Sequence, residues 1–332
     1  MKNKVLITGG AGYIGSHLVL ELLKQDFDLV VFDNFSTGHK ETINSLLKIN
    51  HFDFVEGDLK NKNDIENVFE KYNPNSVFHF AAFSQVPESV VNPQKYYDNN
   101  VCGSINLLNS MAKYDCKKIV FSSTAAVYGE PKYTLIDENH PKNPINPYGQ
   151  TKIMIENIMD DYDKAYGIKS ARLRYFNVIG ASSSSVIGEW HTPETHLVAS
   201  ILISFLSKAC DFKIFGNDYN TSDGTCIRDY IDINDLISAH ILALKYLEKE
   251  NKTNVFNLGT NNGITVLELF NIIQKTLNKK IPYEIIKRRM GDCERLVAQN
   301  NKAKEILNWK INHTIEDSIK SAYNWHKLNI NR

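Results

Sequence analysis

The sequence has none of the features that mark membrane-bound or nucleic-acid-binding proteins. Its apolar runs all fall short of the ~18 residues that a membrane-spanning helix needs, and no polybasic stretch is present. Lysine plus arginine and aspartate plus glutamate each number 38, so the formal charge is zero. We therefore expect no nucleic acid and no membrane as partner, and a location in the cytoplasm.

Disulfide and metal-binding patterns are missing as well. The five cysteines are an odd number at scattered spacings without a CxxC pair: Cys102, Cys116, Cys210, Cys226 and Cys293. The ten histidines show no metal-ligand spacing either. The sequence therefore predicts reduced thiols and no metal site.

A glycine-rich turn near the N-terminus is the most informative pattern that is present. Residues 5–8 form an apolar run of strand length, and residues 16–24 have a helical pattern. Between them stand Gly9, Gly10, Gly12 and Gly15, which fit both Gly-x-Gly-x-x-Gly and Gly-x-x-Gly-x-x-Gly. Glycine lets the backbone approach a pyrophosphate closely, and the helix that starts there points its N–H groups at the phosphate.

A carboxylate at the end of the next predicted strand completes this unit. Residues 29–32 are apolar, and Asp33 follows them. Such a carboxylate can accept hydrogen bonds from both ribose hydroxyls of NAD and would repel the extra phosphate of NADP. The sequence therefore predicts NAD as the cofactor, against the less favoured interpretation of a tight turn without a ligand.

The first half of the chain alternates strand and helix patterns, which is typical of an α/β protein with a Rossmann-type doubly wound parallel sheet. Further strands are expected at 52–55, 76–80, 118–121 and 171–176, and helices at 64–72, 96–114 and 148–166. The rhythm then changes to a polar loop at 180–195, helices at 196–209, 235–248, 266–277, 302–307 and 315–326, and a strand at 254–258.

A length of 332 residues favours about two domains. We expect an NAD-binding Rossmann domain over 1–176, with crossover segments near 229–258. A smaller mixed α/β substrate domain, over 177–228 and 259–332, is expected to pack on it.

A tyrosine four residues before a lysine matters because the two share one face of a helix. Three such pairs occur in the first half of the chain, which carries the predicted cofactor turn. The pair starting at Tyr128 encloses Pro131 and cannot be helical, and the pair starting at Tyr114 straddles a helix end. Only Tyr148 and Lys152 lie in a continuous helical pattern, so we expect the Lys152 ammonium to lower the phenol pKa of Tyr148.

A hydroxyl group at the end of the fifth predicted strand supplies the remaining polar group of the site. The candidates are Ser122, Ser123 and Thr124. With the Tyr148/Lys152 pair they predict a site that removes a proton from an alcohol while hydride passes to NAD. Bringing a tyrosine from a pKa near 10 to about 7 takes roughly 4 kcal/mol. Lys152 and the oxidised nicotinamide are the two positive charges expected to supply it.

Segments along nearly the whole chain carry a resemblance to a known family. They are 8–17, 33–34, 57–59, 97–100, 121–129, 146–149, 174–177, 215–219, 223–225, 228–230 and 291–292. With them the sequence resembles the extended short-chain dehydrogenase/reductases, and within these the UDP-galactose (UDP-glucose) 4-epimerases. The segments from 215 onward are the more specific, since the glycine turn and the Tyr/Lys pair belong to the whole superfamily.

This resemblance implies a reaction and a set of contacts. Tyr148 would take the proton of the sugar 4-hydroxyl, with Thr124 bonded to the same oxygen, and hydride would leave C4 and return to the other face of the 4-keto sugar. The implied cofactor contacts are Gly9, Gly12, Tyr13, Ile14, Gly15, Asp33, Asn34, Asp58, Leu59, Phe80, Ala81, Ala82, Asn99, Ser122, Tyr148, Lys152 and Tyr175. The implied contacts to the UDP-sugar are Thr124, Asn177, Leu197, Phe215, Arg228, Arg289, Asp292 and Leu296.

Two other functions compete with epimerisation. A nucleotide-sugar 4,6-dehydratase needs an acid and a base beside the threonine, where this chain has Ala125 and Ala126, which cannot transfer protons. A non-catalytic NAD-binding regulator could share the fold. The chain also departs from the family's pattern: Thr124 stands where many members carry Ser, and Ser84 where some place a Lys near the cofactor.

The resemblance further implies a substrate range and an assembly. Leu296, four residues past Asp292, would line the sugar pocket, where family members with tyrosine tend to exclude N-acetyl sugars. Leucine there predicts an enzyme that also interconverts UDP-GlcNAc and UDP-GalNAc, unless Leu296 simply packs inward. A homodimer would form through helices 96–114 and 148–166, with Leu107, Leu108, Met111, Ile158 and Met159 either on that surface or in the core.

Overall fold

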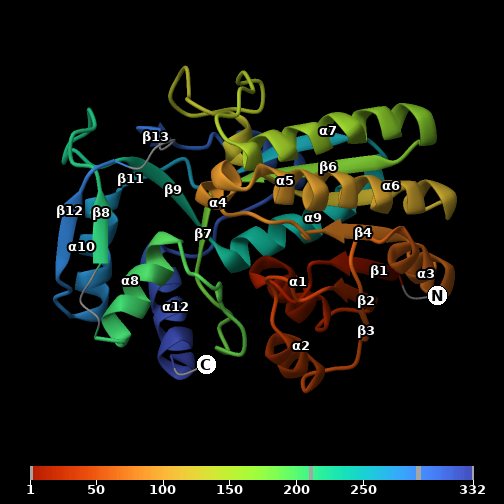
Figure 1. The fold of residues 1–332 in the computed structure, drawn as a ribbon, viewed down its shortest axis with the longest axis horizontal. Helices are drawn as coiled ribbons and strands as arrows, with labels where there is room; N and C mark the ends of the chain where they lie inside the picture. The colour runs from red at the N-terminus through yellow and green to blue at the C-terminus, as the bar shows by residue number, and fades with distance from the viewer. Residues whose placement is uncertain (1–2, 209–211, 289–292, 331–332) are drawn as a thin grey trace. The chain divides into compact units, whose positions relative to one another are not determined.

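The computed structural model describes residues 3–208, 212–288 and 293–330 (Figure 1). The chain divides into two compact units. The first unit comprises 1–129, 142–174 and 237–256, and the second comprises 130–141, 175–236 and 257–332. Relative to the predicted domain bounds, segments 130–141 and 229–236 belong to the second unit. Among the described residues, no helix is both long and apolar enough to cross a membrane.

A seven-stranded sheet organises the first unit, in the order β10-β6-β5-β4-β1-β2-β3. Its strands are β1 Asn3–Thr8, β2 Phe27–Asp33, β3 Asp53–Glu56, β4 Ser76–His79, β5 Lys118–Thr124, β6 Lys169–Tyr175 and β10 Asn254–Leu258. β1 pairs in parallel with both β2 and β4, so the strand order reverses direction there. This confirms the predicted doubly wound α/β fold, in which ligands bind beyond the carboxyl ends of the strands at such a reversal.

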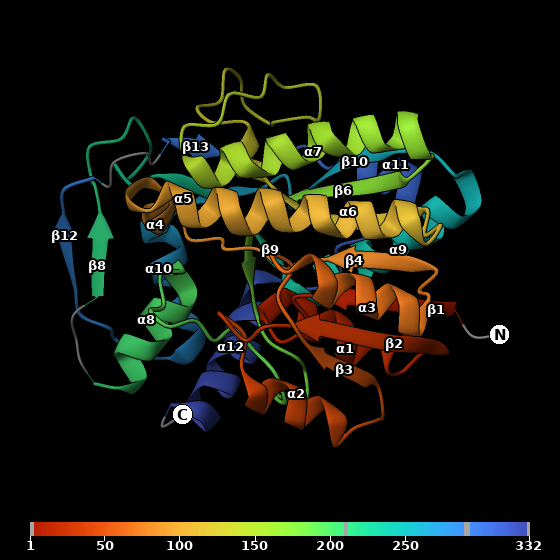
Figure 2. The same ribbon diagram turned by 45° about the vertical axis from the view of Figure 1, so that its right-hand side comes forward.

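Helices cover this sheet, and three of them share one apolar core with it. α3 Lys62–Tyr72, α6 Gly103–Lys113 and α7 Pro147–Tyr166 bury Phe69, Leu108, Ile155 and their neighbours against β1, β2, β4 and β5. Figure 2 shows α6 and α7 side by side. The other helices are α1 Tyr13–Leu22, α2 Lys40–Leu47, α4 Val86–Val91, α5 Pro93–Tyr96 and α9 Ile233–Glu250, of which α9 begins in the second unit.

The burial of this core decides between the two placements expected for the apolar residues of α6 and α7. Leu107, Leu108, Met111 and Met159 are fully buried in the core of the first unit, and Ile158 packs against it. The four-residue spacing on α6 and α7 therefore serves the protein's own packing, so the four buried side chains are no apolar surface for a second copy.

The expected single helix over 96–114 is also interrupted. A π-helical segment, η1 Tyr97–Cys102, separates α5 from α6. Within it the Asn100 side chain accepts a hydrogen bond from Phe83 N at 2.9 Å and donates one to Phe83 O at 3.0 Å. These bonds attach η1 to the loop after β4, which is a contact that helical periodicity does not report. Single π-turns of this kind occur often at functional sites.

The second unit is built from short strands. β9 Ile227–Asp232 pairs with β7 Asn177–Ile179, β11 Gly263–Thr265 and β13 Arg295–Leu296, and β8 Phe212–Phe215 pairs with β12 Tyr283–Ile286. Around them lie α8 Leu197–Leu206, α10 Val266–Leu277, α11 Asn301–Leu307 and α12 Ile315–Asn329. The first unit also contains a short 3-10 turn, η2 Ala125–Val127. α10 has the predicted bounds, whereas the short strands were not predicted.

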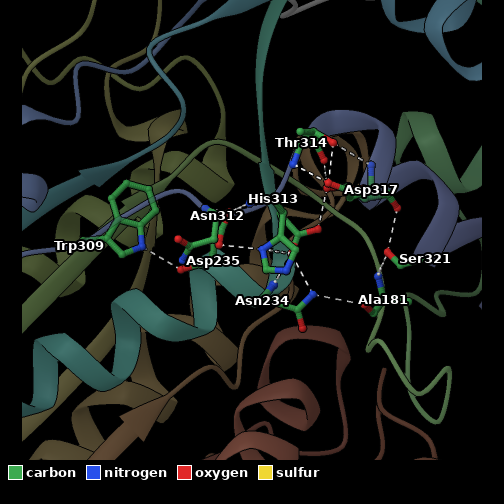
Figure 3. Close-up of polar contacts among 11 residues, drawn as sticks. Ala181, Asn234, Asp235, Trp309, Asn312, His313, Thr314, Asp317 and Ser321 are labelled. Atoms are coloured by element: carbon green, nitrogen blue, oxygen red, sulfur yellow. Dashed lines mark hydrogen bonds and ion pairs between the residues drawn. The ribbon is translucent and has the colours of Figure 1, made fainter. Parts of the chain in front are cut away.

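A carboxylate network fixes the start of α9 in this unit (Figure 3). The Asp235 carboxylate accepts hydrogen bonds from the backbone N–H groups of Asn312 and His313, each at 3.1 Å, and lies 2.8 Å from His313 Nδ1. The indole of Trp309 donates to the Asp235 carbonyl at 2.9 Å. α12 opens with a capping box, in which Thr314 and Asp317 each satisfy a backbone N–H of the other.

Candidate active site

The glycine turn between β1 and α1 is shaped by its own backbone at two positions. Gly9 has φ +77°, and a Cβ there would lie 2.5 Å from Ala81 N. A Cβ on Gly15 would lie 2.2 Å from Gly9 O, so the helix could not approach the strand this closely. Both positions therefore require glycine for the fold itself.

Gly12 is different, because no residue in the described ranges requires glycine there. It precedes the first residue of α1 with φ −82°, which any residue adopts, and a Cβ would meet only Gly9 O at an ordinary 3.5 Å. No side chain caps the helix at this position. A glycine at an uncapped helix N-terminus fits the close approach of a pyrophosphate, which the N–H groups and helix dipole would stabilise. The turn thus fits the predicted dinucleotide.

Asp33, at the carboxyl end of β2, is buried beside this turn. Its carboxylate accepts hydrogen bonds from Ala11 N at 3.0 Å and from Phe35 N at 2.8 Å. Burial raises the pKa of Asp33, although these backbone bonds act to lower it. The carboxylate thus orients the glycine turn and keeps acceptor positions for ribose hydroxyls.

The other predicted cofactor contacts of the first unit lie at neighbouring strand ends. Asn34 donates to Asp58 at 3.1 Å, which joins the segments that follow β2 and β3. Phe80 N and Ala81 N both donate to Thr8 O, and so hold the segment after β4 against β1. Asn99 lies in η1, where its amide donates to Asn100 at 3.0 Å. Leu59, Ala82, Tyr13 and Ile14 belong to the same unit, and Tyr175 ends β6.

The start of α7 follows from local sequence. Asn146 accepts a hydrogen bond from Gly149 N at 2.8 Å as the N-cap, and Pro147 occupies the first helical position, where its missing N–H costs nothing. Tyr148 and Lys152 then fall one turn apart on the buried face. The Tyr/Lys pair therefore has the predicted helical geometry.

Lys152 is held against the strand that carries the hydroxyl groups. Its ammonium donates to Ser122 O at 2.7 Å and lies 5.9 Å from the centre of the Tyr148 ring. Thr124, the last residue of β5, hydrogen-bonds to Tyr148. The three side chains predicted to act together therefore meet within the first unit.

Burial sets the pKa values of this pair in the chain alone. Burial raises the pKa of Tyr148 to about 12, although the hydrogen bond with Thr124 acts to lower it. Burial also lowers the pKa of Lys152 to about 7, against the carboxylate charge of Glu156. That Lys152 and the oxidised nicotinamide together lower the pKa of Tyr148 stays a prediction, because in the chain alone desolvation exceeds the attraction of a partly charged amine.

Glu156 is a residue that the sequence analysis missed. It lies four residues past Lys152 on the same buried face and accepts hydrogen bonds from Ser123 Oγ at 2.6 Å and Arg174 Nε at 2.9 Å. Arg174 also donates to the hydroxyl of Tyr128 at 2.9 Å. The signal was a charged residue continuing the Tyr148–Lys152 stripe, at a position where a carboxylate stays buried only with a partner.

The predicted substrate contacts of the second unit are placed around β9. Asn177, in β7, donates to Asp229 O at 3.3 Å, and Arg228 lies in β9 itself. Leu296, in β13, is the direct register partner of Arg228. Phe215 ends β8 and Leu197 begins α8, both half-buried. Arg289 and Asp292 lie outside the described residues.

A doubly wound sheet, an uncapped glycine turn and a buried Thr–Tyr–Lys set fit the short-chain dehydrogenase/reductase superfamily. Sequence comparison agrees: a family model described as GDP-mannose 4,6 dehydratase matches residues 6–322. The UDP-glucose 4-epimerase of Lactobacillus helveticus is 50% identical over 98% of this chain and 97% of the relative.

Solved structures give the same result. The UDP-glucose 4-epimerase from Bifidobacterium longum, in complex with NAD+ and UDP, has a TM-score of 0.95 at 37% identity and covers 99% of each chain. The UDP-Glc/GlcNAc 4-epimerase from Campylobacter jejuni has a TM-score of 0.85 at 39% identity, over 98% of this chain and 99% of that one. The chain belongs to the UDP-glucose 4-epimerase family.

Proposed function

We propose that this protein interconverts UDP-glucose and UDP-galactose by NAD-dependent inversion at C4 of the sugar, through a 4-keto intermediate. The observation that carries this proposal is the buried contact of Thr124, Tyr148 and Lys152 beside the strand ends that hold the dinucleotide turn. Relatives at up to 50% identity are UDP-glucose 4-epimerases, which supports the same activity.

The chain's own residues supply binding and proton transfer. The N-terminus of α1 and the Asp33 carboxylate would hold the pyrophosphate and the adenosine ribose. Bound NAD supplies an oxidant that takes hydride from C4 and gives it back to the opposite face. Tyr148, in its ionised form, accepts the 4-hydroxyl proton and returns it, while Thr124 holds the same oxygen.

Ionisation of Tyr148 then depends on the complete site. Its pKa of about 12 in the chain alone makes the phenolate scarce at neutral pH. A cationic nicotinamide ring favours the phenolate, and so does the charged form of Lys152. The base is therefore expected to become active only when the oxidised cofactor is in place.

The dehydratase described by the family model is not the function that we propose. Ala125 and Ala126 follow Thr124 in the turn η2 and carry no acid or base for the loss of water from C5 and C6. Analysis of the reaction products should therefore show no 4-keto-6-deoxy sugar.

We also propose that the N-acetylated sugars, UDP-GlcNAc and UDP-GalNAc, are substrates. Leu296 pairs with Arg228, a predicted diphosphate contact, and is only half-buried. This placement supports a role beside the nucleotide sugar rather than in the core. The similarity to an epimerase named for both UDP-Glc and GlcNAc supports the same range.

A coupled assay for conversion of UDP-galactose to UDP-glucose tests the main proposal. Purified protein with bound NAD should turn over without added cofactor, because NAD is regenerated in each cycle. NAD-loaded protein that converts neither the plain nor the N-acetyl sugars would instead be the non-catalytic regulator.

The homodimer and the cytoplasmic location remain predictions from the family resemblance. An interface on α6 and α7 would use their exposed polar residues, such as Asn109 and Asn157, together with partly buried apolar residues such as Ile158. A monomeric mass by light scattering at micromolar protein would contradict the dimer.

A further inference from the structure

Four side chains that the proposed reaction does not use gather in the second unit, in the segment that leads into α8. They are Glu189, His191, Glu194 and His196. Each offers one atom able to bind a metal ion, and the four atoms all lie within 4.8 Å of one another. The two histidines are separated by four residues, an interval that occurs in zinc motifs, but no cysteine pair accompanies them, and the sequence analysis did not single them out.

The distances inside this cluster match those between the ligands of one small cation. His191 Nδ1 lies 3.6 Å from Glu189 Oε1 and 3.3 Å from Glu194 Oε2. His196 Nδ1 lies 3.1 Å from Glu189 Oε1 and 3.0 Å from Glu194 Oε1. In a tetrahedral zinc site with bonds of about 2.0 Å, neighbouring ligand atoms lie about 3.3 Å apart. Each imidazole thus faces both carboxylates at about this separation, with a different oxygen of Glu194 toward each ring.

Charge compensation points the same way. The side chains of Glu189 and Glu194 are only 6% and 8% exposed. Within the described part of the chain, His191 and His196 contact both carboxylates, and Glu194 Oε1 also accepts hydrogen bonds from the backbone N–H groups of Thr195 and His196, each at 2.8 Å. Two buried carboxylates facing two imidazoles are a poor arrangement when the imidazoles are neutral. A divalent cation would neutralise both carboxylates and be bound by both rings.

The donor set restricts the kind of metal. Two imidazole nitrogens and two carboxylate oxygens suit zinc and its neighbours, whereas calcium and magnesium prefer oxygen ligands alone. Four protein ligands would also close the coordination shell, as in structural rather than catalytic zinc sites.

We propose that Glu189, His191, Glu194 and His196 bind one divalent transition-metal ion of the zinc class. His196 is the N-cap residue of α8, and Leu197 is its first residue. The ion would therefore tie the preceding loop to the start of α8 and hold Leu197, a predicted nucleotide-sugar contact, in place.

Zinc binding by the full-length protein tests this proposal without any measurement of activity. Protein stripped with a chelator and titrated with Zn²⁺ should bind one ion per chain by calorimetry and elemental analysis. At a hundredfold excess over the dissociation constant, the melting temperature should rise by about 5 °C. Cobalt in the same site should give the intense visible bands of four-coordinate Co²⁺.

Two single variants locate the site. Glu189→Gln keeps the size and hydrogen-bonding capacity of the side chain, and His191→Gln removes one ring. Each should weaken zinc binding by more than roughly tenfold, since even changes outside the ligand shell cost that much. His51→Gln, at an exposed histidine in the first unit, is the matched control and should bind zinc like the wild type.

Three outcomes would overturn the proposal. Substoichiometric zinc in the wild type, with no rise in melting temperature, would mean that the cluster is a hydrogen-bonded charge network. Unchanged binding by both folded variants would place the ion elsewhere, for example on cysteines. If both variants fail to fold, the wild-type stoichiometry and the cobalt spectrum still decide, and spectra of six-coordinate cobalt would contradict the four-ligand site.

Discussion

The polar row on α7 and the cluster before α8 bury charge in two different ways. On α7, Tyr148, Lys152 and Glu156 follow one another at intervals of four, so the helix itself places them on one face. The cluster residues are irregularly spaced in a segment outside helices and strands, and only the path of the loop brings them together. A polar site on a regular helix can therefore be predicted from residue spacing, whereas a polar site formed by an irregular loop cannot.

The two sites also differ in how their charges are balanced. Glu156 is paired inside the protein with Arg174, through two guanidinium nitrogens, while Ser123 supplies a further bond. The carboxylates of the cluster face imidazoles instead. The charges of the polar row on α7 are therefore balanced without a ligand. Only the ionisation of Tyr148 depends on the cofactor. The cluster gains most from an added cation.

The largest effect is expected from removing the base. Tyr148→Phe should lower turnover by about two to four powers of ten, because the ring remains but the proton acceptor is lost. NAD should stay bound, since the α1 turn and Asp33 are untouched. A coupled epimerase assay with quantification of released NAD measures both effects. Near wild-type turnover would mean that another group is the base.

The ion pair that completes the α7 row is expected to matter for stability. Glu156→Gln leaves the buried guanidinium of Arg174 without a countercharge and should cost about 3 kcal/mol in the free energy of unfolding. Urea denaturation measures this. Asp161→Asn, at an exposed position of the same helix, should change stability by less than about 0.5 kcal/mol. Equal costs for the two variants would contradict the role assigned to the pair.

A selective effect is expected in the second unit. Leu296→Tyr should abolish conversion of UDP-GlcNAc and spare that of UDP-glucose, because a filled pocket rejects the acetamido group by overlap. The ratio of kcat/KM for the two sugars is the measurement, with Leu135→Tyr, at an exposed leucine, as the control. Wild-type protein without N-acetyl activity, or a Leu296 variant that keeps it, would contradict this assignment.

The smallest effect concerns the network around His313 (Figure 3). Burial acts to lower the pKa of His313, but the hydrogen bond to Asp235 and the charges of Asp232 and Asp235 raise it overall. A raised pKa in the folded state means that the stabilisation is fully present below the unfolded value near 6.5 and disappears as pH rises through the folded pKa.

His313→Gln should therefore be less stable than the wild type below about pH 6.5, and the gap should narrow as the pH rises. Solvent screening of this half-exposed side chain limits the effect to less than about 1 kcal/mol. Denaturation series from pH 5 to 9 measure it, with His51→Gln as the control. A stability difference that grows as the pH rises would contradict a raised pKa for His313.

Much of the first unit was predictable because its signals are local. Glycine at position 15 meets a steric demand that Gly9 and Gly10 create, and the α7 pair depends on helical spacing alone. The capping box at Thr314 and the bounds of α10 are local in the same sense. Such patterns are predictable because the geometry of a few consecutive residues determines the structure that they form.

Other features depend on partners far along the chain. β9 escaped prediction because it contains the buried carboxylate of Asp229, which is satisfied by backbone N–H groups of Thr260 and Ala298. The π-helical interruption at Asn100 depends on Phe83, and the burial of Leu107 depends on strands that precede it by many residues.

The sequence by itself determined the sheet, the dinucleotide turn and the Tyr148/Lys152 pair, because residues within one turn of a helix or one strand end suffice to specify them. Only the tertiary structure decided that Glu156 would be neutralised by Arg174, that burial would keep the phenol of Tyr148 protonated in the chain alone, and that four side chains of a polar loop would converge. Desolvation and the path of a loop depend on residues from many parts of the chain, so they cannot be predicted from one stretch of sequence.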